Sequence, residues 1–242
     1  MRTPRIHCDQ PLRAGNTVDL DGQAARHVAR VLRLGPGAAL VLFDGRGGEF
    51  GAHVESVARE VVTVRVGARR DPQGESPLAI SLIQGISRGE RMDYAVQKAV
   101  ELGVTRIDPV FCTRSMVRLP GERLVRRRNH WQGVARSACE QCGRAVVPEV
   151  TMPRPLDERL AQDPGDGTRL LLDPAAGTRL ADLPPPARAT LLVGPEGGLD
   201  DAEAARAREC GFTAVRMGPR TLRTETAAAA AIAVMQGLWG DM

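Results

Sequence analysis

Lysine and aromatic residues are scarce in this chain. Lys98 is the only lysine among 33 basic residues, and aromatic residues make up 3% of the 242 positions. A phosphate-binding Walker loop requires Gly-Lys-Ser or Gly-Lys-Thr, whereas Lys98 is followed by Ala99, so this class of nucleotide site is excluded. With so few aromatic rings, aliphatic residues and alanine must fill the core, and an RNA ligand finds few stacking platforms.

The cysteines are too few and too scattered for a disulfide framework or a metal centre. Five is an odd number, which favours reduced thiols in a chain without an export signal. Cys139 and Cys142 form one Cys-x-x-Cys, but a zinc site requires a second pair, and the four histidines show no ligand spacing. Two helical cysteines on one packed face explain this pair better than zinc or redox chemistry, so we expect no metal.

Long apolar runs are also missing. None approaches the roughly 20 residues that span a bilayer, and the N-terminus lacks the apolar segment of a signal peptide. A hydrophobic content of 43% is nevertheless enough for a sizeable core. We therefore expect a soluble, cytoplasmic protein without a membrane partner.

Two segments near the C-terminal end carry the strongest functional pattern. In residues 191–198 (LLVGPEGG) an apolar run breaks into glycines, and residues 194–198 are called the glycine loop below. In residues 217–226 (MGPRTLRTET) the part 217–223 is called the arginine loop. Each loop follows a predicted strand and precedes a predicted helix. Such units predict parallel strands with both loops at one sheet edge, where one small molecule can contact both.

The helix signals after these loops are clear. Asp200 with Glu203 three residues later is typical of a capping box, and Gly211 is expected to end that helix. Thr224 is expected to cap a second helix whose alanine run reaches Met235. The glycine loop does not have the G-x-G-x-x-G spacing of a dinucleotide fold, which counts against a Rossmann oxidoreductase.

The two loops together closely resemble the C-terminal signature of the SPOUT methyltransferase superfamily, and within it the family that methylates N3 of a uridine in small-subunit ribosomal RNA. The resemblance extends over nearly the whole chain. It includes Pro4-Arg5-Ile6, VLRLGPG (31–37), LFDG (42–45), SRGER (87–91), QKAVELGV (97–104) and ACEQCGR (138–144).

This resemblance implies an α/β fold with two domains. A small PUA-like β-barrel that helps to bind RNA is expected over residues 1–72, and a trefoil-knotted SPOUT methyltransferase domain over residues 73–242. The implied cofactor is S-adenosylmethionine, the implied substrate is 16S ribosomal RNA, within the assembled small ribosomal subunit, and a homodimer is expected. The knot is implied by the resemblance alone, since connections in proteins generally do not thread loops.

The cofactor residues that the resemblance implies come from both loops and from one earlier strand end. Backbone groups are expected to contact the adenosine, and the glycines are expected to shape the pocket. The set is Leu172, Gly194, Pro195, Glu196, Gly197, Gly198, Met217, Gly218, Leu222, Thr224 and Thr226.

The reaction sets the requirements for the catalytic residues. N3 of uracil must lose a proton, and the resulting anion spreads over N3 and two carbonyl oxygens, so a base and a cation are needed. Arg223 and Arg220 are the natural cations, and Glu225 is the nearest carboxylate that can accept the proton. Glu196 is a competing base. For Glu225, compensation of the helix dipole in the first turn is an equally good interpretation.

Basic residues gather between positions 114 and 144, where eight arginines face Glu122 and Glu140, giving 8 − 2 = +6 against +4 for the whole chain. A planar guanidinium binds phosphate with two hydrogen bonds, which suits RNA. The alternative is a solvated face in a chain whose composition favours arginine over lysine. The candidate RNA-binding residues are Arg5, His27, Arg30, Arg33, Arg88, Arg126, Arg127, Arg128 and Arg144.

The order of predicted elements supports this organisation. A turn-rich linker at 70–77 separates a β-rich part, interrupted by a helix at about 22–33, from alternating strands and helices typical of a mainly parallel sheet. The strands of the second part begin with 78–86 and 106–111, with a helix at 90–102 between them. A non-catalytic RNA-binding assembly factor remains an alternative, although the two intact loops count against it.

Overall fold

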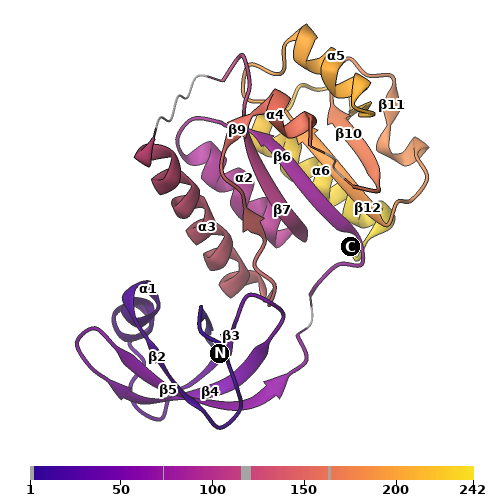
Figure 1. Ribbon diagram of the computed structural model, residues 1–242. Coiled ribbons are helices and arrows are strands. Elements are labelled where there is room, and N and C mark those ends of the chain that lie inside the picture. The colour runs from indigo at the N-terminus through magenta and orange to yellow at the C-terminus, as the bar shows by residue number, and fades with distance from the viewer. Residues whose placement is uncertain (1–2, 73, 116–120, 163–164) are drawn as a thin grey trace. The chain divides into compact units, whose positions relative to one another are not determined.

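The computed structural model describes residues 3–72, 74–115, 121–162 and 165–242 (Figure 1). These residues form two compact units. Unit 1 comprises the chain up to Glu75 together with Arg136–Val147, and unit 2 comprises Ser76–Ala135 and Pro148–Met242. Gln73, at the predicted domain boundary, and Arg118, in the basic segment, lie outside the described residues.

Unit 1 is built on a five-stranded sheet with the order β1-β3-β4-β5-β2. Its hairpins follow from the alternation of apolar residues, since Phe50, Ala52 and Val54 of β4 and the valines of β5 are buried on one face. The turn between β3 and β4 is closed by the Asp44 carboxylate, which accepts from the N–H groups of Arg46 and Gly48. The strands are β1 (Arg5–His7), β2 (Thr17–Leu20), β3 (Ala39–Phe43), β4 (Glu49–Val57) and β5 (Val62–Arg70).

The helix predicted at 22–33 is shorter and irregular. Helix α1 (Gly22–Arg26) passes directly into the π-helix η1 (His27–Val31), and Arg33 adopts a left-handed backbone with φ 52°. The amide of Leu32 donates to the carbonyl of His27, a spacing of five residues. The prediction that His27, Arg30 and Arg33 share one α-helical face is therefore wrong in its geometry, because the π-turn and the left-handed residue change the spacing. Arg30 and Arg33 are exposed and His27 is half-buried.

Residues 136–147 pack with unit 1, whereas the sequence-based boundary placed them in the second domain. The Glu140 carboxylate accepts from the backbone N–H of His7, and Arg144 forms an ion pair with Glu75. Contacts of this kind join positions more than 60 residues apart, so no local pattern predicts them.

Unit 2 contains an eight-stranded sheet whose described pairs are all parallel. The order is β11-β13-β10-β12-β6-β7-β8, and β9 pairs with β7. The central strands are mostly apolar because both faces are covered, although Gln84, Asp108 and Thr190 are buried polar residues within them. The strands are β6 (Ala79–Gly85), β7 (Val104–Phe111), β8 (Glu149–Val150), β9 (Arg154–Pro155), β10 (Thr168–Leu172), β11 (Thr178–Arg179), β12 (Arg188–Val193) and β13 (Thr213–Arg216).

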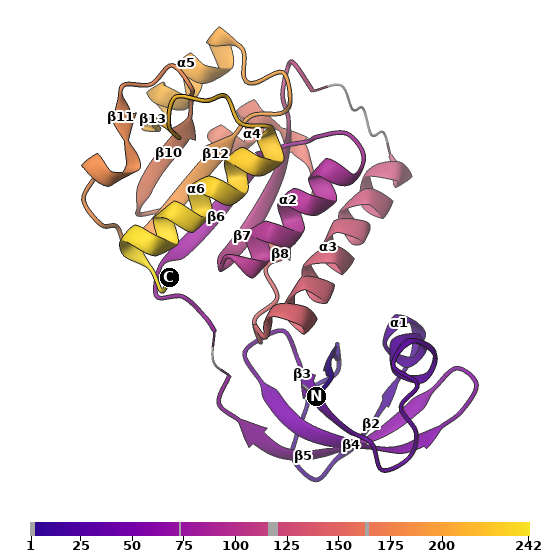
Figure 2. The ribbon, with the colours of Figure 1, turned by 180° about the vertical axis from the view of Figure 1, so that it is seen from behind.

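Helices cover both faces of this sheet. Helices α2 (Glu90–Glu101) and α6 (Thr224–Trp239) lie side by side on one face (Figure 2), and α4 (Leu156–Leu160) and α5 (Asp201–Glu209) lie on the other (Figure 1). Gln236 of α6 is buried, where it accepts from the Ser76 hydroxyl and donates to the Leu102 carbonyl. The remaining helices are α3 (Glu122–Cys142) and the short 3₁₀ turn η2 (Leu180–Asp182).

In the part of the chain described, no helix is both long and apolar enough to cross a membrane. The alternation of strands and helices predicted for the second part is confirmed, with β6, α2 and β7 close to the expected ranges.

Candidate functional site

A cavity of about 770 Å³ opens at the carboxyl edge of the unit 2 sheet. The ends of β10, β12 and β13 meet there because all three strands are parallel, with β10 between the other two. Both the glycine loop and the arginine loop therefore line the same cavity, as predicted. Its volume is in the range of small-molecule sites.

The glycine loop lies so close to its neighbours that side chains would collide. A Cβ on Gly194 would lie 2.9 Å from the Leu199 nitrogen, and Gly198 has φ 69°. A Cβ on Gly85, at the end of β6, would lie 2.4 Å from the Pro195 nitrogen. Gly194 therefore permits close backbone approach, as predicted, and Gly198 permits a left-handed backbone, whereas the need for Gly85 was not predicted.

Two side chains outside the loop hold it in place. Arg114, just after β7, donates from Nη1 to the carbonyls of Gly197 and Leu199, both at 3.1 Å. On the loop itself, Glu196 Oε1 accepts from the Arg88 N–H and from Arg91 Nη1, both at 3.0 Å. Burial acts to raise the pKa of Glu196, but the hydrogen bonds from backbone and Arg91 outweigh it and lower that pKa below the ordinary glutamate value. Glu196 is thus held as a paired anion.

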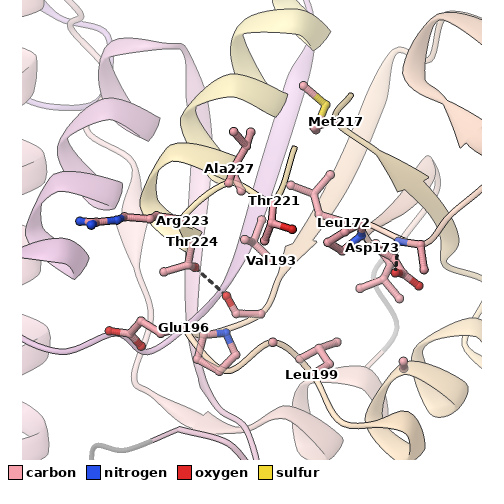
Figure 3. Close-up of a pocket in the computed structure, with 18 of the residues that line it drawn as sticks. Leu172, Asp173, Val193, Glu196, Leu199, Met217, Thr221, Arg223, Thr224 and Ala227 are labelled. Carbon is pink, nitrogen blue, oxygen red and sulfur yellow. Dashed lines mark hydrogen bonds between the residues drawn. The ribbon is translucent and has the colours of Figure 1, made fainter. Parts of the chain in front are cut away.

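The start of α6 differs from the prediction. The N-cap is Arg223, without a side-chain cap, and Thr224 is the first helical residue. The Thr224 hydroxyl instead donates to the Gly194 carbonyl at 2.6 Å (Figure 3). This hydroxyl therefore makes a hydrogen bond to a residue 30 positions away rather than to the backbone of its own helix. The predicted capping box of Asp200 and Glu203 in α5 is confirmed.

Apolar and charged side chains both line the cavity, with Asp173 beside Leu172 (Figure 3). Leu172, Val193 and Met217 line it together, whereas Arg223 extends away from them, on the side of Glu196 (Figure 3). Glu225 also lines the cavity, and its Oε2 atom is buried without a hydrogen-bond partner. Buried carboxylate oxygens normally have partners, so this atom is unusual, and a ligand can reach it only if the Glu225 side chain rotates.

Most predicted residues of the two loops meet at this cavity. All three predicted catalytic residues, Arg220, Arg223 and Glu225, line it. Gly197 and Thr226 do not. The predicted cofactor residues that line it are Leu172, Gly194, Pro195, Glu196, Gly198, Met217, Gly218, Leu222 and Thr224.

The predicted RNA-binding residues are not brought together. Arg5 and Arg144 are buried in unit 1, where Arg5 pairs with Glu49 and stacks over the Phe43 ring. This arrangement favours a structural role over a surface contact. Arg88 is exposed beside the glycine loop.

On α3, Arg126 and Arg127 are exposed, with Arg126 paired to Glu122, while Arg128 donates to the Val150 carbonyl. The arginines of α3 therefore include both a solvated face and a structural contact.

Sequence reasoning did not select several residues that shape the site. Arg91 and Arg114 line the cavity, as do Asp173 and Leu199, and the buried Gln84 donates to Thr224. Arg114 could have been found, because it follows a parallel strand and must lie at the same carboxyl edge. Gln84 could not, because it lies within a buried strand and its partner is 140 residues away.

Among the described residues, no three His, Cys, Asp or Glu side chains gather as metal ligands would, and all five cysteines are free. Burial raises the pKa of the Cys139 thiol to about 12.

Residues 74–236 match the family described as the RNA methyltransferase domain, and residues 20–67 match the RNA methyltransferase PUA domain. A protein of Buchnera aphidicola named ribosomal RNA small subunit methyltransferase E is 30% identical, covering 100% of this chain and 98% of the relative. A protein of the same name from Mycobacterium bovis is 33% identical over 90% of this chain and 85% of its own length.

The chain belongs to the ribosomal RNA small subunit methyltransferase E family. Solved structures of two similar proteins agree with this assignment. A methyltransferase of Legionella pneumophila in complex with S-adenosylmethionine is 39% identical, with a TM-score of 0.96 over 100% of both chains. A family member from Neisseria gonorrhoeae bound to S-adenosylmethionine is 41% identical, with a TM-score of 0.93 over 100% of both chains.

Proposed function

We propose that this chain transfers the methyl group of S-adenosylmethionine to N3 of uracil 1498 in 16S ribosomal RNA, within the assembled small subunit. The observation that carries the proposal is the single cavity at which the glycine loop, the arginine loop and Glu225 converge. Family members named for ribosomal RNA methylation, and similar structures that hold S-adenosylmethionine, support it.

The cavity suits this cofactor. The glycine loop and the backbone around Leu172, Met217 and Leu222 line the cavity and would hold the adenosine. At Gly194 a Cβ would collide with the Leu199 nitrogen, so only a residue without a side chain fits there. When bound, S-adenosylmethionine supplies an electrophilic methyl group on a sulfonium centre. The residues around it need only position the acceptor nitrogen and remove its proton.

Glu225 is the better candidate for the base. Glu225 is half-buried and lines the cavity, and no partner among the described residues occupies its Oε2, so rotation of the side chain would let the carboxylate accept the proton of a uracil N3–H. Glu196 is less suited, because two hydrogen bonds occupy its Oε1 and its lowered pKa weakens its basicity. Arg223 and Arg220 are exposed at the cavity and would stabilise the negative charge that develops on the uracil oxygens.

RNA binding is proposed for the exposed arginines. Five arginines and five carboxylates line the cavity, and Arg220 and Arg223, which are exposed there, would be the ones to contact phosphate. Arg88, with Arg126 and Arg127 on α3, would also bind RNA within unit 2. In unit 1, RNA binding is proposed separately for Arg30, Arg33 and the half-buried His27.

Three further features belong to the proposal. The resemblance implies a trefoil knot in the SPOUT domain and a homodimer, for which the exposed Val234 and Leu238 of the alanine-rich helix α6 offer an apolar face. Ribosomal RNA as substrate implies a place in the cytoplasm.

The decisive experiment combines cofactor binding with mapping of the product. Calorimetry should show S-adenosylmethionine binding, and mass spectrometry of small subunits from a strain lacking this modification should detect N3-methyluridine after incubation with the protein. Gly194→Val should abolish cofactor binding, because its Cβ has no space. Gly177→Val is the matched control, since a Cβ at Gly177 meets nothing within 4 Å. Methylation at another base or position would overturn the proposed specificity.

A further inference from the structure

A series of hydrogen bonds links the buried interior of the unit 2 sheet to the first residue of α6 and to the glycine loop. Gln84, the penultimate residue of β6, is 0% exposed. Its Nε2 donates to the Gly85 carbonyl at 3.1 Å and to the Thr224 hydroxyl at 3.0 Å. The Thr224 hydroxyl in turn donates to the Gly194 carbonyl at 2.6 Å.

The direction of each hydrogen bond is fixed by chemistry. The Gly85 carbonyl can only accept, so the amide nitrogen of Gln84 must face it and also faces Thr224. Thr224 therefore accepts from Gln84, and its single hydroxyl proton is directed to Gly194. That proton is not available to a ligand, so the hydroxyl of Thr224 acts on the cavity through the glycine loop.

These hydrogen bonds connect the residues proposed for catalysis with the loop proposed to hold the cofactor. Thr224 lies between Arg223 and Glu225, the residues proposed to act on the uracil, and Gly194 begins the loop proposed to hold the cofactor. In the part of the chain that the structure describes, Thr224–Gly194 is the one side-chain hydrogen bond between the glycine loop and residues 217–225. The rest of the glycine loop is held from elsewhere, by Arg114 and through Glu196.

We propose that Gln84 and Thr224 are positioning residues that set the placement of the methyl donor relative to Arg223 and Glu225. This inference rests on the proposed function. Since Arg114 and Glu196 still hold the glycine loop, breaking this series of hydrogen bonds should leave cofactor binding nearly intact. It should instead slow methyl transfer, because a displacement of about 1 Å between reacting groups can cost about 100-fold in rate.

The test is single-turnover methyl transfer at saturating S-adenosylmethionine and small subunits, paired with calorimetry on the cofactor. Thr224→Val keeps the shape and removes the hydroxyl, and should lose about 10- to 100-fold in rate with less than about a threefold change in cofactor affinity. Thr224→Ser keeps the hydroxyl and should retain the parental rate within about threefold. Gln84→Met, which leaves the Thr224 hydroxyl without its orienting donor, should lose about tenfold.

Two controls separate positioning from stability. Thr105→Val removes a hydroxyl that donates to the Ile80 carbonyl at 3.0 Å. Thr105 is exposed and does not line the cavity, so this variant should keep the parental rate. The double variant of Gln84→Met and Thr224→Val should be no slower than Thr224→Val alone, because both changes break the same series of hydrogen bonds. A calorimetric stoichiometry near one cofactor per chain shows that each variant is folded at its site. If Thr224→Val does not fold, the transfer rates of Gln84→Met and Thr224→Ser are compared instead, and the proposal requires Gln84→Met to be the slower of the two.

The outcomes are distinct. A parental protein that neither binds S-adenosylmethionine nor transfers methyl overturns the proposed function and this inference with it. An active parental protein overturns the inference alone if Thr224→Val transfers at the parental rate, if it fails only by losing the cofactor, or if the two changes multiply in the double variant.

Discussion

Two arginines of unit 1 and two arginines at the unit 2 cavity differ in their environments. In unit 1, Arg5 and Arg144 are buried and paired with Glu49 and Glu75. At the cavity, Arg220 and Arg223 are exposed, and Glu225 has a buried oxygen without a partner. In a chain that uses arginine almost exclusively as its basic residue, the environment of an arginine therefore reveals more about its role than its presence does.

The largest expected effect tests the cavity side of this comparison. Arg223→Ala should reduce single-turnover methyl transfer by about 10²- to 10³-fold, because a donor to a developing oxyanion is lost, while cofactor affinity stays nearly unchanged. Arg223→Lys should rescue poorly, since a point charge does not reproduce the planar guanidinium. Transfer at the parental rate once RNA saturates would make Arg223 a binding residue only.

The next effect tests the unit 1 side. Arg144→Ala should lower the free energy of unfolding by about 2 to 3 kcal/mol, less than for a fully buried pair because Glu75 is partly exposed. The change should appear in urea unfolding monitored on unit 1. Arg13→Ala, at an exposed arginine, is the control. If Arg144→Ala is as stable as the parent but binds RNA less tightly, Arg144 has the surface role that the sequence suggested.

A smaller effect is expected on α3. Replacing Arg126, Arg127 and Arg128 by Ala should weaken RNA binding and flatten its salt dependence by about 0.9 or less per lost phosphate contact. Arg128 already donates within unit 2, so we expect the exposed Arg126 and Arg127 to account for most of the change. Arg188→Ala, at the other end of β12 from the cavity, is a control for the loss of one exposed positive charge away from this surface. An unchanged slope would identify a solvated face.

The smallest effect concerns pH. The folded-state pKa of Glu196 is lowered, so its interactions stabilise the fold above the pKa of an unfolded glutamate, about 4.3, and this stability is lost as pH falls through the lower folded value. Because the pair with Arg91 is exposed, Glu196→Gln should remove at most about 0.5 kcal/mol at neutral pH and flatten the acid limb of the unfolding profile. Glu158→Gln is the control. If Glu196→Gln slows methyl transfer strongly while the free energy of unfolding stays nearly unchanged, Glu196 becomes the better candidate for the base.

The cavity was predictable because its parts obey local rules. The apolar run before Gly194, the Asp200 capping box and the order of strands and helices place both loops at one edge without any knowledge of distant contacts. The residues expected from the resemblance, such as Leu172 and Met217, then line the same space.

What could not be predicted depends on partners far away in sequence. The burial of Arg5 requires Glu49 and the Arg144 carbonyl, and the role of Thr224 requires Gln84 and Gly194. The π-helix His27–Val31 was likewise not predicted, because no local pattern in HVARV distinguishes it from an α-helical turn. Sequence patterns identify which edge of the sheet is used, whereas tertiary contacts decide which polar groups remain free there.

The hydrogen bonds of the buried Gln236 have a consequence for folding during translation. They join the last helix of unit 2 to Ser76 and to the Leu102 carbonyl, which are made 160 and 134 residues earlier. At about 5 to 20 residues per second, roughly 8 to 32 s separate the synthesis of Ser76 from that of its partner. During that interval β6 and α2 exist without the helix that covers them, so nascent unit 2 offers an apolar surface that a chaperone can protect until translation brings α6 into place.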